Sequence, residues 1–308
     1  MVKLQVNVYK LPYVRNLFKW AHRVVLPGLH GASLYEVTKF FVCELTISSL
    51  KERAAAVTFN FLMAMPPTLL FLFSILPYLP FKHVDKTIFN ILKLVTPNNN
   101  IYLNVRNIVV DFMAKQHGSL LSFGIILVLY FSSNGVNSLI RYFDKTIPLY
   151  KKRNRFQRRW TAIKLTIMLI GVSIITLSVL IIQSKDLNPY ILKVFHDLVV
   201  IKIISSVILT FLVFITISLI YTYGPSLTHR FKFISAGSVF ATIASVTATS
   251  IFFYLVNNFL NYNKVYGSIG TLIAFMVWVW LNSIIILLGY EFNMSILLGK
   301  LSRENKDE

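Results

Sequence analysis

Six long apolar stretches constrain the fold of this 308-residue chain more than any other feature of its sequence. A helix needs about 20 mostly apolar residues to cross the hydrocarbon core of a bilayer. The stretches reach this length, which is too long for buried strands, and they lack the alternating pattern of a membrane barrel. The expected membrane spans are residues 54–79, 119–139, 160–182, 201–223, 234–257 and 267–298.

The composition indicates the same fold class. Hydrophobic residues make up 56% of the chain and charged residues only 14%, against roughly 25% charged in an average soluble domain. No polar segment is long enough to fold separately. We therefore predict an all-α protein, a polytopic membrane helical bundle of about six transmembrane helices with short amphipathic surface helices. Its expected parts are an interfacial arm at 1–50, a transmembrane domain at 51–298 and a polar tail at 299–308.

The placement of basic residues predicts the orientation in the membrane. The net charge is +19, and most lysines and arginines lie before the first span, between spans two and three, and after span six. The positive-inside rule then places both termini and the 141–159 loop in the cytoplasm. The gap at 80–118, which this orientation places outside, supports it least, because it holds five basic residues.

The basic run at 151–159 would also attract nucleic acid, but a loop at the bilayer surface has the same composition, so no nucleic-acid partner is expected.

The first fifty residues have the pattern of surface helices rather than of a span. Leu11, Val14 and Phe18 share one helical face, with Arg15 and Lys19 beside it. Such a helix suits either an anionic leaflet or the inner face of the protein itself. Two serines, at positions 33 and 49, are each followed three residues later by glutamate. This capping-box pattern predicts the start of a second surface helix and of the first span.

Polar side chains inside the spans are candidates for a substrate path, because buried polar groups in a membrane are costly and need partners. The Pro66-Pro67 pair is expected to break the first span. The hydroxyl residues of the fifth span share one face, which indicates either close helix packing or a polar cavity wall. Glu291 either pairs with a basic residue or has a functional role. The candidate path comprises Asn60, Pro67, Asn134, Asn137, Ser238, Thr242, Ser245, Thr249 and Glu291.

The expected outer loop between spans five and six is rich in aromatic and amide side chains. Its tyrosines suit the interfacial aromatic belt, and the loop would also suit contact with a lipid headgroup or a substrate. The candidate contact residues are Tyr262, Asn263, Lys264, Tyr266 and Gly267.

Sequence motifs for catalysis or metal binding are absent. The six histidines form no HxH or HExxH pattern, and the single cysteine, Cys43, excludes an internal disulfide and a CxxC site. The chain also has no GxSxG or phosphate-binding glycine motif. We therefore expect no catalytic residues, no metal, no cofactor and no enzymatic activity.

Several segments together resemble a known family. They are Met65-Pro-Pro67, Ser133-Asn-Gly-Val-Asn-Ser-Leu-Ile-Arg-Tyr-Phe143, Ile220-Tyr-Thr-Tyr-Gly-Pro225, Tyr262-Asn-Lys-Val-Tyr-Gly-Ser-Ile-Gly270, Trp278-Val-Trp280 and Leu287-Leu-Gly-Tyr-Glu-Phe-Asn293. The chain resembles the YihY/BrkB family of bacterial inner-membrane proteins over roughly residues 35–298. Tyr290 departs from the family's usual alanine. The resemblance implies a six-helix inner-membrane protein of a family linked in part to virulence and formerly mislabelled ribonuclease BN.

Two functions are consistent with these features. The first is transport or lipid handling in the cell envelope, with membrane lipids and anionic headgroups as partners. The resemblance also favours this function, because lipid transport has been suggested for relatives. The second is a non-catalytic membrane scaffold that docks envelope proteins through its N-terminal arm and outer helices.

Overall fold

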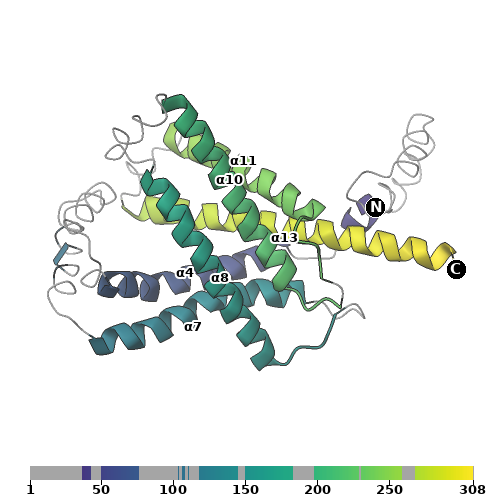
Figure 1. Ribbon diagram of the computed structural model, residues 1–308, viewed down its shortest axis with the longest axis horizontal. Helices are drawn as coiled ribbons and strands as arrows, with labels where there is room; N and C mark the ends of the chain where they lie inside the picture. The colour runs from purple at the N-terminus through teal and green to yellow at the C-terminus, as the bar shows by residue number, and fades with distance from the viewer. Residues whose placement is uncertain are drawn as a thin grey trace.

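The computed structural model describes residues 37–42, 50–75, 118–144, 150–182, 198–228, 230–258 and 268–307, together with residues 103, 106, 107 and 110. This part of the chain contains six long helices (Figure 1). They are α4 (Leu50–Ile75), α7 (Gly118–Phe143), α8 (Arg155–Ile182), α10 (Leu198–Tyr223), α11 (Ala236–Asn258) and α13 (Ser268–Asp307).

Each long helix coincides with one predicted span, and the described residues form no strand beyond the isolated bridge between Tyr150 and Leu227. The all-α fold is confirmed. Two details differ from the prediction. α4 runs as one helix through Pro66 and Pro67, because the proline φ angle is helical and the pair removes only two backbone hydrogen bonds. α13 continues to Asp307, so most of the predicted polar tail is helical.

The helices are arranged as a closed ring. α4 packs against α7, α7 against α8, α8 against α10, α10 against α11, α11 against α13, and α13 against α4. In Figure 1, α8 and α10 pass diagonally in front of α4 and α13, and α13 projects beyond the bundle toward the C-terminus. Its 40 residues give a length of about 60 Å, twice the roughly 30 Å of a hydrocarbon core.

Local sequence signals fix the ends of these helices. Ser235 precedes α11, and its Oγ accepts the backbone N–H of Ser238 at 3.2 Å while the Oγ of Ser238 accepts the N–H of Ser235 at 3.0 Å. This reciprocal pair is a capping box built from two serines. At the end of α10, the Gly224 N–H donates to the Ile220 carbonyl at 3.0 Å, and Pro225 follows. Glycine and then proline after the last turn is a common way to end a helix.

Residues 144 and 150–154 meet residues 224–228 and 230–235 at one end of the bundle, here called the loop end. The Lys151 N–H donates to the Ser226 carbonyl, and the Ser226 N–H donates to the Asp144 carboxylate, both at 2.8 Å. The Arg153 guanidinium donates to the carbonyls of Gly224 and Pro225. Burial lowers the pKa of Arg153, and the nearby Asp144 carboxylate opposes this shift. Arginine still keeps its charge at neutral pH.

Large side chains of four helices are fully buried in the core next to the loop end. The largest fully buried side chains include Phe143 of α7, Leu165 of α8, Tyr221 of α10 and Tyr290 of α13. The core therefore joins helices around the ring at one level, and that level positions the polar groups described below.

The outward sides of the helices are apolar. Val207, Ile243 and Ile174 are 63%, 63% and 59% exposed. Large exposed apolar faces are unfavourable in water but suit a bilayer. By length and composition, four helices of the described chain can cross a membrane, in the segments Arg155–Thr176, Ile203–Tyr223, Ala236–Val256 and Leu272–Ser302. The chain is an integral membrane protein, and its crossing number of six stays a prediction.

One short piece of the predicted arm is described. Val37–Val42 is helical, as expected after the capping signal at residue 33. Val37 is buried with Ile296, and the Phe41 ring lies edge-on to Phe292 at 5.8 Å between centroids. This segment therefore docks on α13. The predicted first arm helix, around residues 11–25, lies outside the described residues.

Candidate functional site

Glu291 of α13 forms an ion pair with Arg53 in the first turns of α4. The carboxylate Oε1 lies 3.4 Å from the Arg53 Nη1, and the two side chains are 1% and 24% exposed. A buried carboxylate needs such a partner, because desolvation of an isolated charge is very unfavourable. The pair fastens the first helix of the ring to the last.

Asn293, two residues further along α13, holds the start of α11. Its Oδ1 accepts the Gly237 N–H at 2.7 Å, and its Nδ2 donates to the Ser235 hydroxyl at 2.9 Å. One amide thereby satisfies an unpaired N–H of the first helical turn and the hydroxyl that caps it. Gly237 is one of the small residues of α11, which let the helix backbones approach closely.

Tyr290, the residue before Glu291, is fully buried. Its ring stacks on Phe143 with centroids 4.1 Å apart. Its hydroxyl lies 2.7 Å from the Tyr150 hydroxyl and donates to the Phe143 carbonyl at 3.1 Å. That carbonyl belongs to the last turn of α7, where carbonyls have no hydrogen-bond partner within their own helix. The tyrosine therefore ties α13 to the end of α7 and to the loop end.

A Tyr290→Phe variant tests the hydroxyl separately from the ring. We expect it to destabilise the protein by about 1–2 kcal/mol, because the buried Phe143 carbonyl loses its donor and the partly buried Tyr150 hydroxyl loses one of its partners. Tyr254→Phe on α11 is the matched control, since that side chain is 61% exposed. Thermal melting of the detergent-purified variants measures the difference. Equal melting temperatures would show that the buried hydroxyl adds nothing.

The asparagines of the predicted path lie at two other interfaces. Asn60 of α4 donates to the Ser138 hydroxyl of α7 at 3.4 Å and to its own helix at the Ala56 carbonyl. Asn134 of α7 accepts a hydrogen bond from Arg159 of α8. The Oδ1 of Asn137, also on α7, is buried and has no hydrogen-bond partner in the described structure.

The hydroxyl face of α11 packs mainly against α13. The Ser245 hydroxyl bonds to Asn282, and the Trp278 indole N–H donates to the Thr249 hydroxyl at 3.2 Å. Thr242 differs, because its side chain lies at the boundary with α10. Close packing is thus the observed role for most of this face.

The structure brings together only part of the predicted path. Ser238 and Glu291 lie near the loop end, Ser245 and Thr249 lie further along the α11–α13 interface, and the asparagines lie on the α7 side of the ring. Pro67 is within α4, and its side chain is not among those described. The outer-loop candidates at 262–267 lie outside the described residues. The continuous path stays a prediction.

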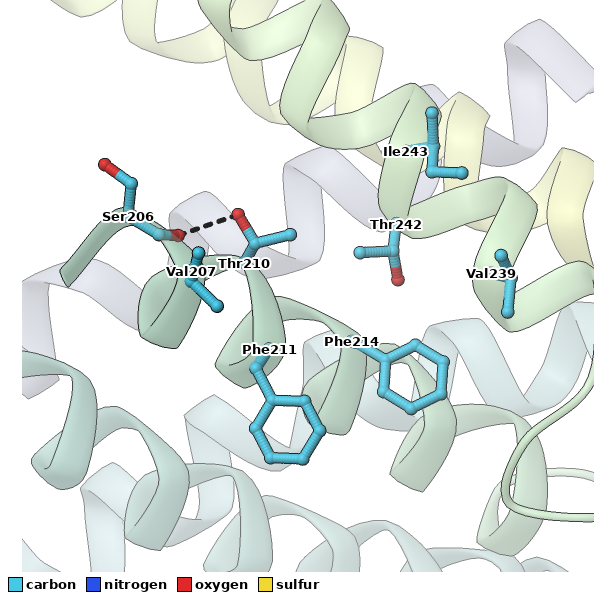
Figure 2. A pocket seen from close by; sticks show the side chains of 8 residues that line it. All are labelled: Ser206, Val207, Thr210, Phe211, Phe214, Val239, Thr242 and Ile243. Atoms are coloured by element: carbon cyan, nitrogen blue, oxygen red, sulfur yellow. Dashed lines mark hydrogen bonds between the residues drawn. The ribbon is translucent and has the colours of Figure 1, made fainter. Parts of the chain in front are cut away.

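A groove opens between α10 and α11. Its volume is about 460 Å³, and its walls are largely apolar. Figure 2 shows Phe211 and Phe214 of α10 facing Val239, Thr242 and Ile243 of α11 across the opening. The remaining lining residues are Ser206, Val207 and Thr210 of α10. Because Val207, Phe211 and Ile243 are exposed, the groove opens to the side of the bundle.

The groove has few free hydrogen-bonding groups. The Thr210 hydroxyl donates to the Ser206 carbonyl at 2.9 Å (Figure 2), and the Thr242 hydroxyl donates to the Ser238 carbonyl at 2.7 Å. Hydroxyls that bond to their own helix do not need water or a polar ligand. The groove is therefore suited to an apolar occupant.

Comparison with known proteins identifies the family. The virulence factor BrkB family matches residues 44–308, which include all six long helices. The chain belongs to the BrkB family. The match begins at residue 44 and reaches residue 308, whereas the resemblance seen in the sequence covers roughly residues 35–298.

Several relatives align over most of their length. The ribonuclease-like protein YfkH of Bacillus subtilis is 29% identical over 256 residues, covering 80% of this chain and 90% of YfkH. The UPF0761 membrane protein MS0032 of Mannheimia succiniciproducens is 25% identical and covers 85% and 88%. The UPF0761 membrane protein NTHI0384 of Haemophilus influenzae is 23% identical and covers 79% and 88%. No solved structure matches this BrkB-family chain.

Sequence reasoning missed three of the residues that organise the loop end. Arg53 is one of the basic residues before the first span that predict the orientation, Asn293 belongs to the family-like segment 287–293, and Tyr290 departs from the usual residue there, but none of these features predicts the contacts observed. One signal was available for Asn293 and Tyr290: they flank Glu291 in an apolar helix, where each polar group must find a partner. The groove had no sequence signal, because it depends on the separation of two helices.

Proposed function

We propose that this protein handles or transports lipid in the bacterial inner membrane, and that the groove between α10 and α11 holds an acyl chain. The groove itself is the observation that supports this proposal. It opens sideways from a bundle whose outer surface is apolar, so a lipid could enter from the bilayer without crossing water. Its volume of about 460 Å³ lies within the usual range of small-ligand sites.

Hydrogen bonds to the neighbouring core hold the α11 wall of the groove in place. Ser238 and Thr242 belong to the α11 turn beside the groove, and Ser238 is held by the capping pair with Ser235. Asn293 anchors the same turn on α13. A wall held by several hydrogen bonds keeps its shape, which reduces the entropic cost of ordering a ligand.

The orientation is part of the proposal. We place the loop end at the cytoplasm, so both termini are cytoplasmic. Lys151, Lys152 and Arg155 are exposed at this end, and exposed basic residues near a span favour the cytoplasmic side. We assign no catalytic step, cofactor or nucleic-acid partner to the protein, and membrane lipids are its proposed partners.

An Ile243→Trp variant tests the groove by filling it. We expect about tenfold less tightly retained phospholipid per protein, because the indole occupies the space between the two helices. Ile251→Trp on the same helix is the matched control. Ile251 is 54% exposed and does not line the groove. Quantitative mass spectrometry of lipids retained after gentle detergent extraction gives the readout.

Equal lipid retention in the two tryptophan variants would overturn the acyl-chain assignment. A scaffold would then be the better interpretation. In that case removal of residues 1–30 should abolish capture of envelope proteins, while changes in the groove should have no effect.

A further inference from the structure

We infer that the groove selects an anionic phospholipid, whose headgroup is held by Arg230 and Lys232 at the loop end. This inference rests on the proposed function, since it names the class of lipid for the same groove. It starts from the segment that joins α10 to α11, which carries both cations.

The segment places alternate side chains in different surroundings. The Phe231 ring packs against Tyr290 of the core, with centroids 5.9 Å apart. The Phe233 ring packs edge-on against Phe214, with centroids 6.3 Å apart. Lys232 lies between these two anchored phenylalanines and is exposed. Its ammonium group is therefore presented to the surroundings by a segment fixed on both sides.

This arrangement connects the cations to the groove. Phe214 lines the groove, so its partner Phe233 lies at the end of the groove nearest the loop. Arg230 is exposed, and its guanidinium lies over the Tyr223 ring, 5.8 Å from the centroid. Tyr223 is the last residue of α10. Both cations therefore stand where α10 leaves the apolar region, which is the level of a phospholipid headgroup.

The two walls of the groove and the segment that joins them carry no acidic residue, and the Asp144 carboxylate of α7 at the loop end accepts the Ser226 N–H. From Leu198 to Asn258, which includes both walls and the joining segment, the sequence contains no aspartate or glutamate. Within α10, α11 and the joining segment, no carboxylate competes with a phosphate oxygen for Arg230 and Lys232. Arginine and lysine both bind phosphate strongly, arginine through its two-pronged fork. An apolar groove ending at two such cations complements a lipid with apolar chains and a negative headgroup.

The test compares two double variants in nanodiscs of defined composition. Arg230→Gln with Lys232→Gln removes two positive charges at the groove. Lys151→Gln with Lys152→Gln removes two positive charges from exposed positions elsewhere at the loop end. The readout is the ratio of phosphatidylglycerol to phosphatidylcholine retained by each protein from an equal mixture, measured by native mass spectrometry. We expect the first variant to lose about tenfold in this ratio and the second to keep it.

Other results overturn the inference in distinguishable ways. If both double variants lose the preference equally, the selectivity comes from general surface charge. If neither loses it, the two cations hold no headgroup. In both cases the lipid-handling function survives as long as Ile243→Trp still lowers lipid retention. If Ile243→Trp leaves lipid unchanged and converts a dimer into a monomer, the groove holds a second copy of the chain, and both proposals fail.

Discussion

Alanine at position 289 is expected to lower the melting temperature of the purified protein by roughly 6–12 °C, which corresponds to overpacking by about 3 kcal/mol. A Cβ atom on Gly289 would collide with the Tyr221 hydroxyl and lie 2.7 Å from the Ala241 Cβ and 2.9 Å from the Gly237 carbonyl oxygen. The Tyr221 hydroxyl cannot move away easily, since it donates to the Ile286 carbonyl at 2.6 Å.

The control for this variant is Gly171→Ala on α8. Gly171 is also helical, but a Cβ there would meet nothing within 4 Å. Alanine is the better helix former, so this variant should be neutral or slightly stabilising. Thermal melting followed by size-exclusion chromatography in detergent compares the two. If both variants melt at the same temperature, α10, α11 and α13 do not meet as closely as described.

The second large effect concerns the ion pair between α4 and α13. We expect Arg53→Ala to destabilise the protein by about 3 kcal/mol or more, because it removes the cation beside a buried carboxylate. Glu291→Gln should be milder, since a neutral amide of the same shape needs no cation. Glu291→Gln added to Arg53→Ala should therefore restore much of the lost stability. The free energy of unfolding or the melting temperature in detergent gives the comparison.

The double variant decides the interpretation of Glu291. Rescue by glutamine would show that the carboxylate is mainly a structural partner of Arg53. If Glu291→Gln leaves stability unchanged but lowers lipid retention, the carboxylate has a functional role. No rescue would contradict the ion pair as the cause of the destabilisation.

The helices were predictable because one requirement dominates them. A run of about 20 apolar residues satisfies its own backbone hydrogen bonds only as a helix when water is absent. The start of α4 at Leu50, directly after the capping signal at residue 49, and the start of α11 after Ser235 were also close to the prediction. These boundaries depend on residues within one turn, so a local pattern contains the necessary information.

The candidate site depends on contacts between distant parts of the chain. Arg53 and Glu291 are separated by 238 positions, and no local pattern indicates that they meet. Tyr290 is buried because Phe143, Tyr150 and the joining segment surround it, and each comes from a different part of the chain. At the Pro66-Pro67 pair the local pattern misled instead. The two prolines predict a break, but α4 continues through them as one apolar helix.

Photo-crosslinking tests most directly whether a lipid occupies the groove. The protein is reconstituted with phosphatidylglycerol that carries a diazirine in one acyl chain, irradiated, digested and mapped by mass spectrometry. The account predicts that adducts concentrate in peptides containing residues 206–214 of α10 and 239–243 of α11, and that Ile243→Trp removes them. Adducts spread equally over other exposed apolar surfaces, such as Ile167 and Ile174 of α8, would contradict it.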